Sequence, residues 1–398
     1  MKQAILDTVQ SHASEIYAFL RSLIAIESYD SHEQAVITRI REEMVRVGFD
    51  RTEIDPMGNL LGYIGNGSHL IAMDGHCDTV SCSDRNNWEF DPFSGMETDE
   101  LIGGLGSSDQ KGGIAAMVYA GLVLKELGLT DDFTLLVVAS VQEEDYDGLC
   151  WKYIIEEDGI RPEFVVLTEP CDRMIRNGQR GRMEIRVDTK GISSHGSTPE
   201  LGVNAIYHMG PVIGAIKRLH GSLRDDGVLG KGSITISEIR STAPSRCAVS
   251  DSCSLTLDRR TNSIETKELV LDQIRSLKEV KDANATVGLY HEGTPSWTGL
   301  LYSAEKYYPA WILDPQDKVC QAIVNTHRKL FGEELLVIPW QFSTNGVSIM
   351  GIHRIPCVGY GPGHGDQAHK PNEVTWKQEL LQACAVYAFL PFVYLSSS

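Results

Sequence analysis

The sequence has too few basic residues to balance its acidic ones. Against 36 Lys and Arg stand 54 Asp and Glu, which gives a formal net charge of −18 across 398 residues. Phosphate backbones and anionic membranes repel such a chain, so binding to nucleic acid or to a membrane is disfavoured. Low-complexity segments and internal repeats are missing too, and 42% of the residues are hydrophobic, which excludes a largely disordered protein.

Paired cysteines and long apolar runs are also absent. Nine cysteines are scattered without a CxxC pair, so free thiols in a reducing compartment are expected. The most apolar run, residues 133–141, is far shorter than the roughly 20 residues of a membrane span. The N-terminal 20 residues form an amphipathic helical pattern interrupted by charges rather than a signal peptide. These absences predict a cytoplasmic protein, with only Ser396–Ser398 as a tail.

The first half of the chain alternates helical and strand patterns. Residues 34–48 place five apolar side chains on one helical face, and a second helix is expected from Asp109 to Leu129. LLGYIG, HLIAMDGH, FTLLVVASV and FVVLTEP are short apolar runs typical of strands. Apolar runs separated by helices predict an α/β domain with a mostly parallel, helix-covered sheet, which collects ligands at the carboxyl ends of its strands.

The pattern changes after about residue 180. Strands and helices then follow the order β-α-β-β-α-β, which is the ferredoxin-like arrangement, and the α/β pattern resumes near Trp311. We therefore expect a catalytic domain formed by residues 1–180 and 295–398, with an α+β domain, residues 181–294, inserted into it.

Histidine and carboxylate side chains stand where several apolar runs end. In MDGHCDTV, His76 and Asp78 are two residues apart, so on an extended strand they point to the same side. Asp78 can then accept from one imidazole nitrogen while the other nitrogen binds a metal. A polar strand end in a turn fits the same pattern. Asp109, in GGLGSSDQKGG, is either a ligand at a helix start or a simple N-cap, and the spacing of a phosphate loop is absent.

Two adjacent glutamates, Glu143 and Glu144, follow the apolar strand FTLLVVASV. Neighbouring strand residues point to opposite sides, so one carboxylate can bind a metal while the other faces the substrate as a general base. Without a cation, two such acids at a buried strand end suffer from desolvation and mutual repulsion. A solvated loop is the alternative.

Glu169 ends the strand FVVLTEP, and His364 and His369 lie in the loop GYGPGHGDQAHKPNE. Alone, a histidine in such a loop is more often a surface residue than a ligand. Together, these motifs supply imidazoles and carboxylates without thiolates, a set that suits Zn²⁺, with Co²⁺ or Mn²⁺ as substitutes. A carboxylate shared between two ligand sets would build a two-metal site with ions about 3.5–4 Å apart.

In their order along the chain, these motifs resemble those of the dinuclear-zinc amidohydrolases and metallopeptidases, which include acetylornithine deacetylase, succinyl-diaminopimelate desuccinylase, aminoacylase and glutamate carboxypeptidase. The resemblance spans nearly the whole chain. Within this family, the chain looks most like the YgeY-type hydrolases, which are described as linked to selenium metabolism. It implies two Zn²⁺ ions per subunit, with Glu143 as general base, Asp78 as the carboxylate that orients a ligand, and His364 as a nearby loop residue. The metal ligands that it implies are His76, Asp109, Glu144, Glu169 and His369, with Asp109 bridging both ions.

The inserted segment has its own resemblance to the family. GISSHGSTPELGVNAI matches the segment whose histidine stabilises the reacting oxyanion in the other subunit, which implies that His195 has this role in a homodimer. LTLDRR matches a strand whose arginine grips the substrate carboxylate, which makes Arg260 a candidate, with an exposed strand arginine as the alternative. Asn345 stands where the family usually has aspartate and is a further substrate-binding candidate.

Three departures from the family pattern concern the substrate rather than the metals. CAVS, residues 247–250, replaces Asn-Val-Val-Pro, Thr344-Asn345-Gly346 replaces Thr-Asp-Gly, and Leu105 replaces an arginine between two glycines. The resemblance implies a hydrolase that cleaves the amide bond of a small N-acetyl, N-succinyl or N-carbamoyl amino acid. The alternatives are a dipeptidase or aminopeptidase, and a metal-binding relative without catalysis, against which the intact Glu143 argues.

Overall fold

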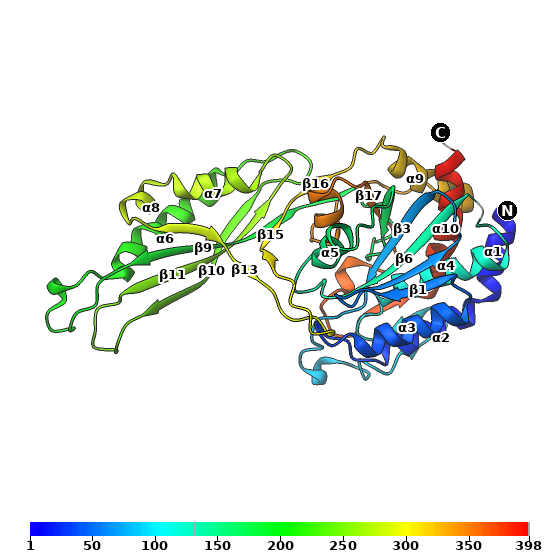
Figure 1. The fold of residues 1–398 in the computed structure, drawn as a ribbon, viewed down its shortest axis with the longest axis horizontal. Helices are drawn as coiled ribbons and strands as arrows, with labels where there is room; N and C mark the ends of the chain where they lie inside the picture. The colour runs from blue at the N-terminus through cyan, green and yellow to red at the C-terminus, as the bar shows by residue number, and fades with distance from the viewer. Residues whose placement is uncertain (131, 397–398) are drawn as a thin grey trace.

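The chain folds into two bodies, each with its own large hydrophobic core. The structure, a computed structural model, describes residues 1–130 and 132–396. The larger core draws on both ends of the sequence, whereas the buried residues of the second run only from Met183 to Val280. Figure 1 shows the two bodies side by side, with the inserted one on the left and both chain termini at the far right.

The larger body is built on a six-stranded sheet. Strand β3 lies parallel to β6 and β7, and β7 lies parallel to β17, whereas β2 pairs antiparallel with β1 and β6. The sheet is therefore mainly parallel, as predicted. Across the sheet the strands are β1 (Arg51–Ile54), β2 (Leu60–Ile64), β6 (Phe133–Ser140), β3 (His69–His76), β7 (Phe164–Leu167) and β17 (Cys357–Gly359).

Seven helices of the described residues belong to this body, and α4 is the most central of them. Nearly all of α4 is buried, because it packs between the sheet and helices α2 and α10. The helical pattern predicted for residues 34–48 is α3, whereas the N-terminal pattern forms two helices that meet at His12. The helices are α1 (Lys2–Ser11), α2 (Ala13–Ile24), α3 (Gln34–Arg46), α4 (Lys111–Glu126), α5 (Leu149–Glu156), α9 (Lys318–Phe331) and α10 (Lys377–Ser396).

Helix α10 is long and apolar enough to cross a membrane, and it is the one such helix in the described part of the chain. It is longer than the apolar run of residues 133–141, from which no segment of membrane-spanning length was expected. Of its most apolar window 61% is buried, and it packs against α4, α9 and α1, as a core helix does. The helix includes Ser396, which was expected in the tail, and residues 397–398 lie outside the described part.

The inserted body is an antiparallel sheet with helices on one face. Its element order is the predicted β-α-β-β-α-β, with the second helix divided in two. In β9 and β11 buried residues alternate with more exposed ones, because one face covers the second core and the other faces away from it. Its elements are β9 (Gly181–Lys190), α6 (Ala205–Ser222), β10 (Ser233–Thr242), β11 (Ser252–Thr261), α7 (Lys267–Arg275), α8 (Lys278–Asp282) and β12 (Thr286–Leu289).

The chain returns from the inserted body through short strands. Strand β15 lies beyond residue 294 and still pairs with β9, so the return segment extends the inserted sheet. Near the larger sheet, β18 pairs with β5 and brings the segment after His369 beside the loop that contains Asp109. The short strands are β4 (Met96–Glu97), β5 (Leu101–Gly103), β8 (Gly178–Gln179), β13 (His291–Glu292), β14 (Ala304–Glu305), β15 (Tyr307–Tyr308), β16 (Trp311–Ile312) and β18 (Val374–Trp376). The short helical turns are η1 (Arg85–Asn87), η2 (Pro199–Leu201), η3 (Val347–Ile352) and η4 (Gly365–Gln367).

Candidate metal centre

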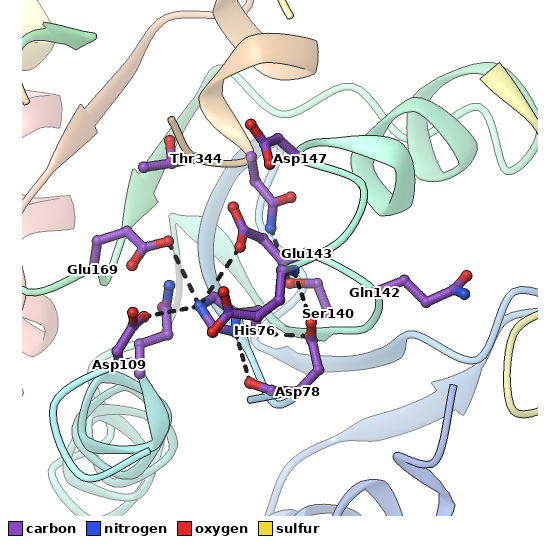
Figure 2. Close-up of polar contacts among 12 residues, drawn as sticks. His76, Asp78, Asp109, Ser140, Gln142, Glu143, Asp147, Glu169 and Thr344 are labelled. Atoms are coloured by element: carbon purple, nitrogen blue, oxygen red, sulfur yellow. Dashed lines mark hydrogen bonds and ion pairs between the residues drawn. The ribbon is translucent and has the colours of Figure 1, made fainter. Parts of the chain in front are cut away.

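The carboxyl ends of three neighbouring parallel strands meet at one edge of the large sheet. His76 is the last residue of β3, Glu143 and Glu144 follow β6, and Glu169 follows β7. Asp109 reaches the same place from the loop before α4, and His369 from the loop after η4. Figure 2 shows His76 at the centre, with contacts to Asp109, Glu143, Glu169 and Asp78.

Asp109 lies between two groups of side chains. Its Oδ1 is 3.1 Å from Nε2 of His76, and its Oδ2 is 3.5 Å from Nε2 of His369. The same nitrogen of His76 is 3.8 Å from Glu143 and 3.9 Å from Glu169, whereas His369 is 2.9 Å from Glu144. One carboxylate thus lies between two groups of potential metal donors, which is the arrangement that a two-metal site requires.

The electrostatics of this cluster favour bound cations. Burial and the neighbouring carboxylates raise the pKa of Glu143 and of Glu169 well above the usual value, and burial with Asp109 nearby raises the pKa of Glu144. Burial alone would lower the pKa of His76, but its hydrogen bond to Asp109 and the other acids raise it well above the usual value. Oε1 of Glu143 is buried without a hydrogen-bond partner. The nitrogen and oxygen donors fit Zn²⁺, whose charge would relieve this repulsion.

Asp78 lies behind His76, fully buried, but its contacts differ from the expectation. Nδ1 of His76 is 3.0 Å from the backbone carbonyl of Asp78 and 3.7 Å from its carboxylate. The other carboxylate oxygen accepts the backbone N–H of Glu144 at 2.9 Å. Asp78 therefore contacts both the imidazole of His76 and the backbone of Glu144.

Asp109 is not the N-cap of α4, because the helix begins at Lys111 and Gln110 precedes it without a side-chain cap. The loop is held instead by Glu373, which was not among the predicted site residues. The carboxylate of Glu373 accepts the backbone N–H groups of Gly106 at 2.8 Å, Ser108 at 2.7 Å and Asp109 at 2.9 Å. A signal was present in the sequence, since Glu373 ends AHKPNE, the motif that contains His369.

A cavity of about 360 Å³ opens over the cluster, and the inserted body contributes two arginines to its wall. Arg260 was predicted there, and it forms a two-point contact with Asp258 at 2.9 and 3.0 Å. Arg182 was missed, as was Asp147, whose carboxylate lies 3.4 Å from the guanidinium of Arg182. The lining residues are His76, Asp109, Glu143, Glu144, Asp147, Glu169, Arg182, Arg260, Phe342, Ser343, Gly365, Ala368 and His369.

Three other candidate residues lie elsewhere. His195 is exposed in the inserted body, with Nδ1 2.7 Å from the hydroxyl of Ser197, and does not line this cavity. Asn345 is fully buried and does not line it either; its amide donates to Asp74 and its oxygen accepts the N–H of Gly148. His364 stacks on Trp376 and does not line the cavity.

Known proteins match the chain over nearly its full length. The model of Peptidase family M20/M25/M40 matches residues 72–391. The chain is 55% identical over 393 residues to the protein YgeY of Escherichia coli strain K12, covering 99% of this chain and 98% of that one. It is 24% identical to a probable succinyl-diaminopimelate desuccinylase of Staphylococcus epidermidis, covering 98% of this chain and 99% of that one.

A solved structure has the same fold. The Bacillus subtilis YXEP protein, described as a dinuclear metal-binding peptidase of the M20 family, superposes with a TM-score of 0.69 at 12% identity. The match covers 97% of this chain and 99% of that one.

Proposed function

Because the chain belongs to peptidase family M20/M25/M40, we propose that it hydrolyses the amide bond of a small N-acylated amino acid at a dinuclear zinc centre. The observation that carries this proposal is the position of Asp109, with one carboxylate oxygen toward His76 and the other toward His369. A two-metal hydrolase needs this shared ligand and a free carboxylate nearby to accept a proton, which Glu143 supplies.

The first zinc would be held by His76, Asp109 and Glu169, and the second by Asp109, Glu144 and His369. Co²⁺ or Mn²⁺ could take the same nitrogen and oxygen donors. When bound, zinc acts as a Lewis acid and lowers the pKa of a water toward about 7.

Glu143 is the general base of this proposal. Its carboxylate is buried, lines the cavity and has one oxygen without a hydrogen-bond partner. Glu143 takes the proton of the attacking water and passes it to the nitrogen of the leaving amine. The products are a carboxylic or carbamic acid and an amino compound.

The inserted domain, which we place at residues 181–294, would supply the side chains that bind the substrate carboxylate and stabilise the oxyanion. Arg260 lines the cavity and can grip the substrate carboxylate once it separates from Asp258. His195 would stabilise the oxyanion of the partner subunit in a homodimer, since it is exposed and away from its own cavity. We assign Asn345 a structural role, because its amide groups are all engaged inside the fold. The described cysteines are all free, in keeping with a cytoplasmic protein.

A dipeptidase or aminopeptidase is the second candidate, and Asp147 is the observation that favours it. One of its carboxylate oxygens is buried without a hydrogen-bond partner, and the residue lines the cavity. A free α-ammonium group of a peptide would satisfy that oxygen, whereas an acyl group would not.

A substrate screen separates these candidates. The zinc- and cobalt-loaded protein is incubated with N-acetyl, N-succinyl and N-carbamoyl amino acids and with dipeptides, and the released amine is measured. We expect turnover of an N-acyl or N-carbamoyl amino acid, which Glu143→Gln should lower by about 10²–10⁴-fold at equal metal content. Turnover of dipeptides alone would favour the peptidase, and no turnover by a fully metal-loaded protein would contradict the proposed activity.

A further inference from the structure

The loop that carries Glu143 and Glu144 is bonded to the chain segment that returns from the inserted domain. This loop, residues 142–147, lies between β6 and α5, and the return segment covers residues 290–308. We propose that Thr294 and Lys306 are positioning residues for Glu143, because they tie the loop to the inserted domain so that the position of this domain sets where the Glu143 carboxylate lies. The role in catalysis rests on the function proposed above.

Thr294 contacts the loop on both sides of the two glutamates. Its backbone carbonyl accepts a hydrogen bond from the side-chain amide of Gln142 at 3.2 Å, and its hydroxyl lies 2.7 Å from the hydroxyl of Tyr146. Figure 2 shows the Gln142 side chain extending away from the metal cluster. Thr294 does not line the cavity over the cluster, so it can influence Glu143 only through the loop.

Lys306 makes the second connection, and its backbone belongs to the inserted sheet. Its carbonyl accepts the N–H of Glu184 in β9 at 3.1 Å, while its own N–H donates to the carbonyl of Tyr290 at 2.9 Å. Its buried ammonium group donates to the carbonyl of Asp145 at 3.0 Å and lies 3.8 Å from the ring centroid of Tyr146. A shift of the inserted sheet is therefore transmitted directly to the loop.

The catalytic domain holds the other side of the same loop. Glu33, fully buried at the start of α3, accepts the backbone N–H of Gln142 at 3.1 Å, and Asp78 accepts that of Glu144 at 2.9 Å. Gln142 has φ of 56°, the left-handed region, which a non-glycine residue keeps only when surrounding contacts impose it. Gln142, the residue before the proposed base, is thus hydrogen-bonded both to Glu33 of the catalytic domain and to Thr294 of the return segment.

These contacts bear on how the Glu143 carboxylate is placed relative to the attacking water. Proton transfer by a general base depends on hydrogen-bond reach, and small displacements of a catalytic group lower the rate strongly. Closure of the inserted domain over a substrate would therefore complete the placement of Glu143, whereas loosening the connection should lower kcat more than it raises KM.

The test compares hydrogen exchange and turnover in the zinc-loaded, full-length protein. Thr294→Val and Tyr146→Phe remove the same hydroxyl contact from opposite sides, and Thr294→Ser restores it. Thr298→Val is the matched control, because its hydroxyl bonds the same return segment to the carbonyl of Pro56, at 2.6 Å, and not to the loop. Exchange is measured by mass spectrometry on peptides that cover residues 141–148, and turnover on the compound that the substrate screen finds to be hydrolysed fastest.

We expect Thr294→Val and Tyr146→Phe each to speed exchange in the loop and to lower kcat by about 3- to 10-fold, the range for one lost hydrogen bond. The double variant should be no worse than either single one, and zinc content, KM and the Thr298→Val control should change less than about twofold. Unchanged loop exchange in both single variants, or faster exchange with unchanged kcat, would overturn the proposal. If no compound is hydrolysed, the proposed function fails, and the exchange data still decide whether Thr294 holds the loop.

Discussion

Replacing Glu373 by alanine should damage both stability and metal binding, although its side chain is not predicted to be a ligand. The carboxylate is buried and accepts three backbone N–H groups, those of Gly106, Ser108 and Asp109. An unpaired buried donor costs about 1–3 kcal/mol, and partial relaxation or an entering water reduces the sum, so we expect Glu373→Ala to lose roughly 3–6 kcal/mol. The loop would then no longer hold Asp109 between the two ligand sets.

The variant Glu373→Gln keeps the size of the side chain and changes only its hydrogen bonds, so it separates the loss of hydrogen bonds from the loss of side-chain volume. One oxygen of Glu373 accepts from both Ser108 and Asp109, and a glutamine oxygen can keep these two bonds. The amide nitrogen would instead face the N–H of Gly106, which leaves one donor unpaired and costs about 1–3 kcal/mol. The order of stability should therefore be wild type, then Glu373→Gln, then Glu373→Ala.

Thermal unfolding and a chelator-competition titration with zinc measure the two effects. We expect Glu373→Ala to lower the unfolding midpoint by about 4–7 °C and to weaken the binding of both ions, since Asp109 is shared. Glu100→Ala, an exposed glutamate near the same strands, is the control and should shift the midpoint by less than about 1 °C. A midpoint and zinc affinity of Glu373→Ala equal to those of the control would refute this reasoning.

Three further predictions follow from other parts of the structure. Glu143→Gln should keep its metals and lower kcat by about 10²–10⁴-fold, whereas Asp109→Ala should lose both metals and activity; near-wild-type kcat in the first would contradict the assigned role. Mixing Glu143→Gln with His195→Ala subunits should restore up to about a quarter of wild-type activity, because half of the randomly exchanged dimers are mixed and each mixed dimer holds one intact site. If mass spectrometry shows that subunits have exchanged and no activity returns, a histidine acting across the dimer is rejected. Burial opposes the charge of His12, but hydrogen bonds to Glu15 and Glu126 raise its pKa above the usual 6.5. The ion pairs of charged His12 then stabilise the fold fully below about pH 6.5, and their contribution is lost as pH rises through the folded pKa. His12→Gln should therefore cost more unfolding free energy at pH 6 than at pH 8. An equal cost at both pH values would argue against these ion pairs.

The centre of the large sheet could be predicted because β3, β6 and β7 are short apolar runs that end at, or lead into, histidine or acid. Such runs fold as buried parallel strands, and parallel neighbours bring their carboxyl ends to one edge, where His76, Glu143 and Glu169 meet. The β-α-β-β-α-β order of the inserted domain followed from alternation within its strands. Local periodicity was sufficient in both cases, because burial of one or both strand faces dictates the pattern.

The residues that were missed act through contacts between distant parts of the chain. Glu373 and Glu33 accept backbone N–H groups, which any segment can supply, so the sequence does not identify their partners, although Glu373 ends the motif AHKPNE. Asp147 and Arg182 meet only because the inserted domain folds back over the loop. Asn345 was expected at the substrate, but its neighbours enclose it in the fold, and no local pattern distinguishes a buried amide from one that faces a cavity.

The metal content of the purified protein tests the dinuclear centre most directly. Elemental analysis after mild purification, with zinc or cobalt added back and excess removed, should give close to two divalent ions per chain for the wild type. His369→Ala, which removes a ligand of the second ion only, should give close to one, since His76, Asp109 and Glu169 remain together. Fewer than one ion per wild-type chain after metal is added back would contradict the two-metal site on which the proposed hydrolysis depends.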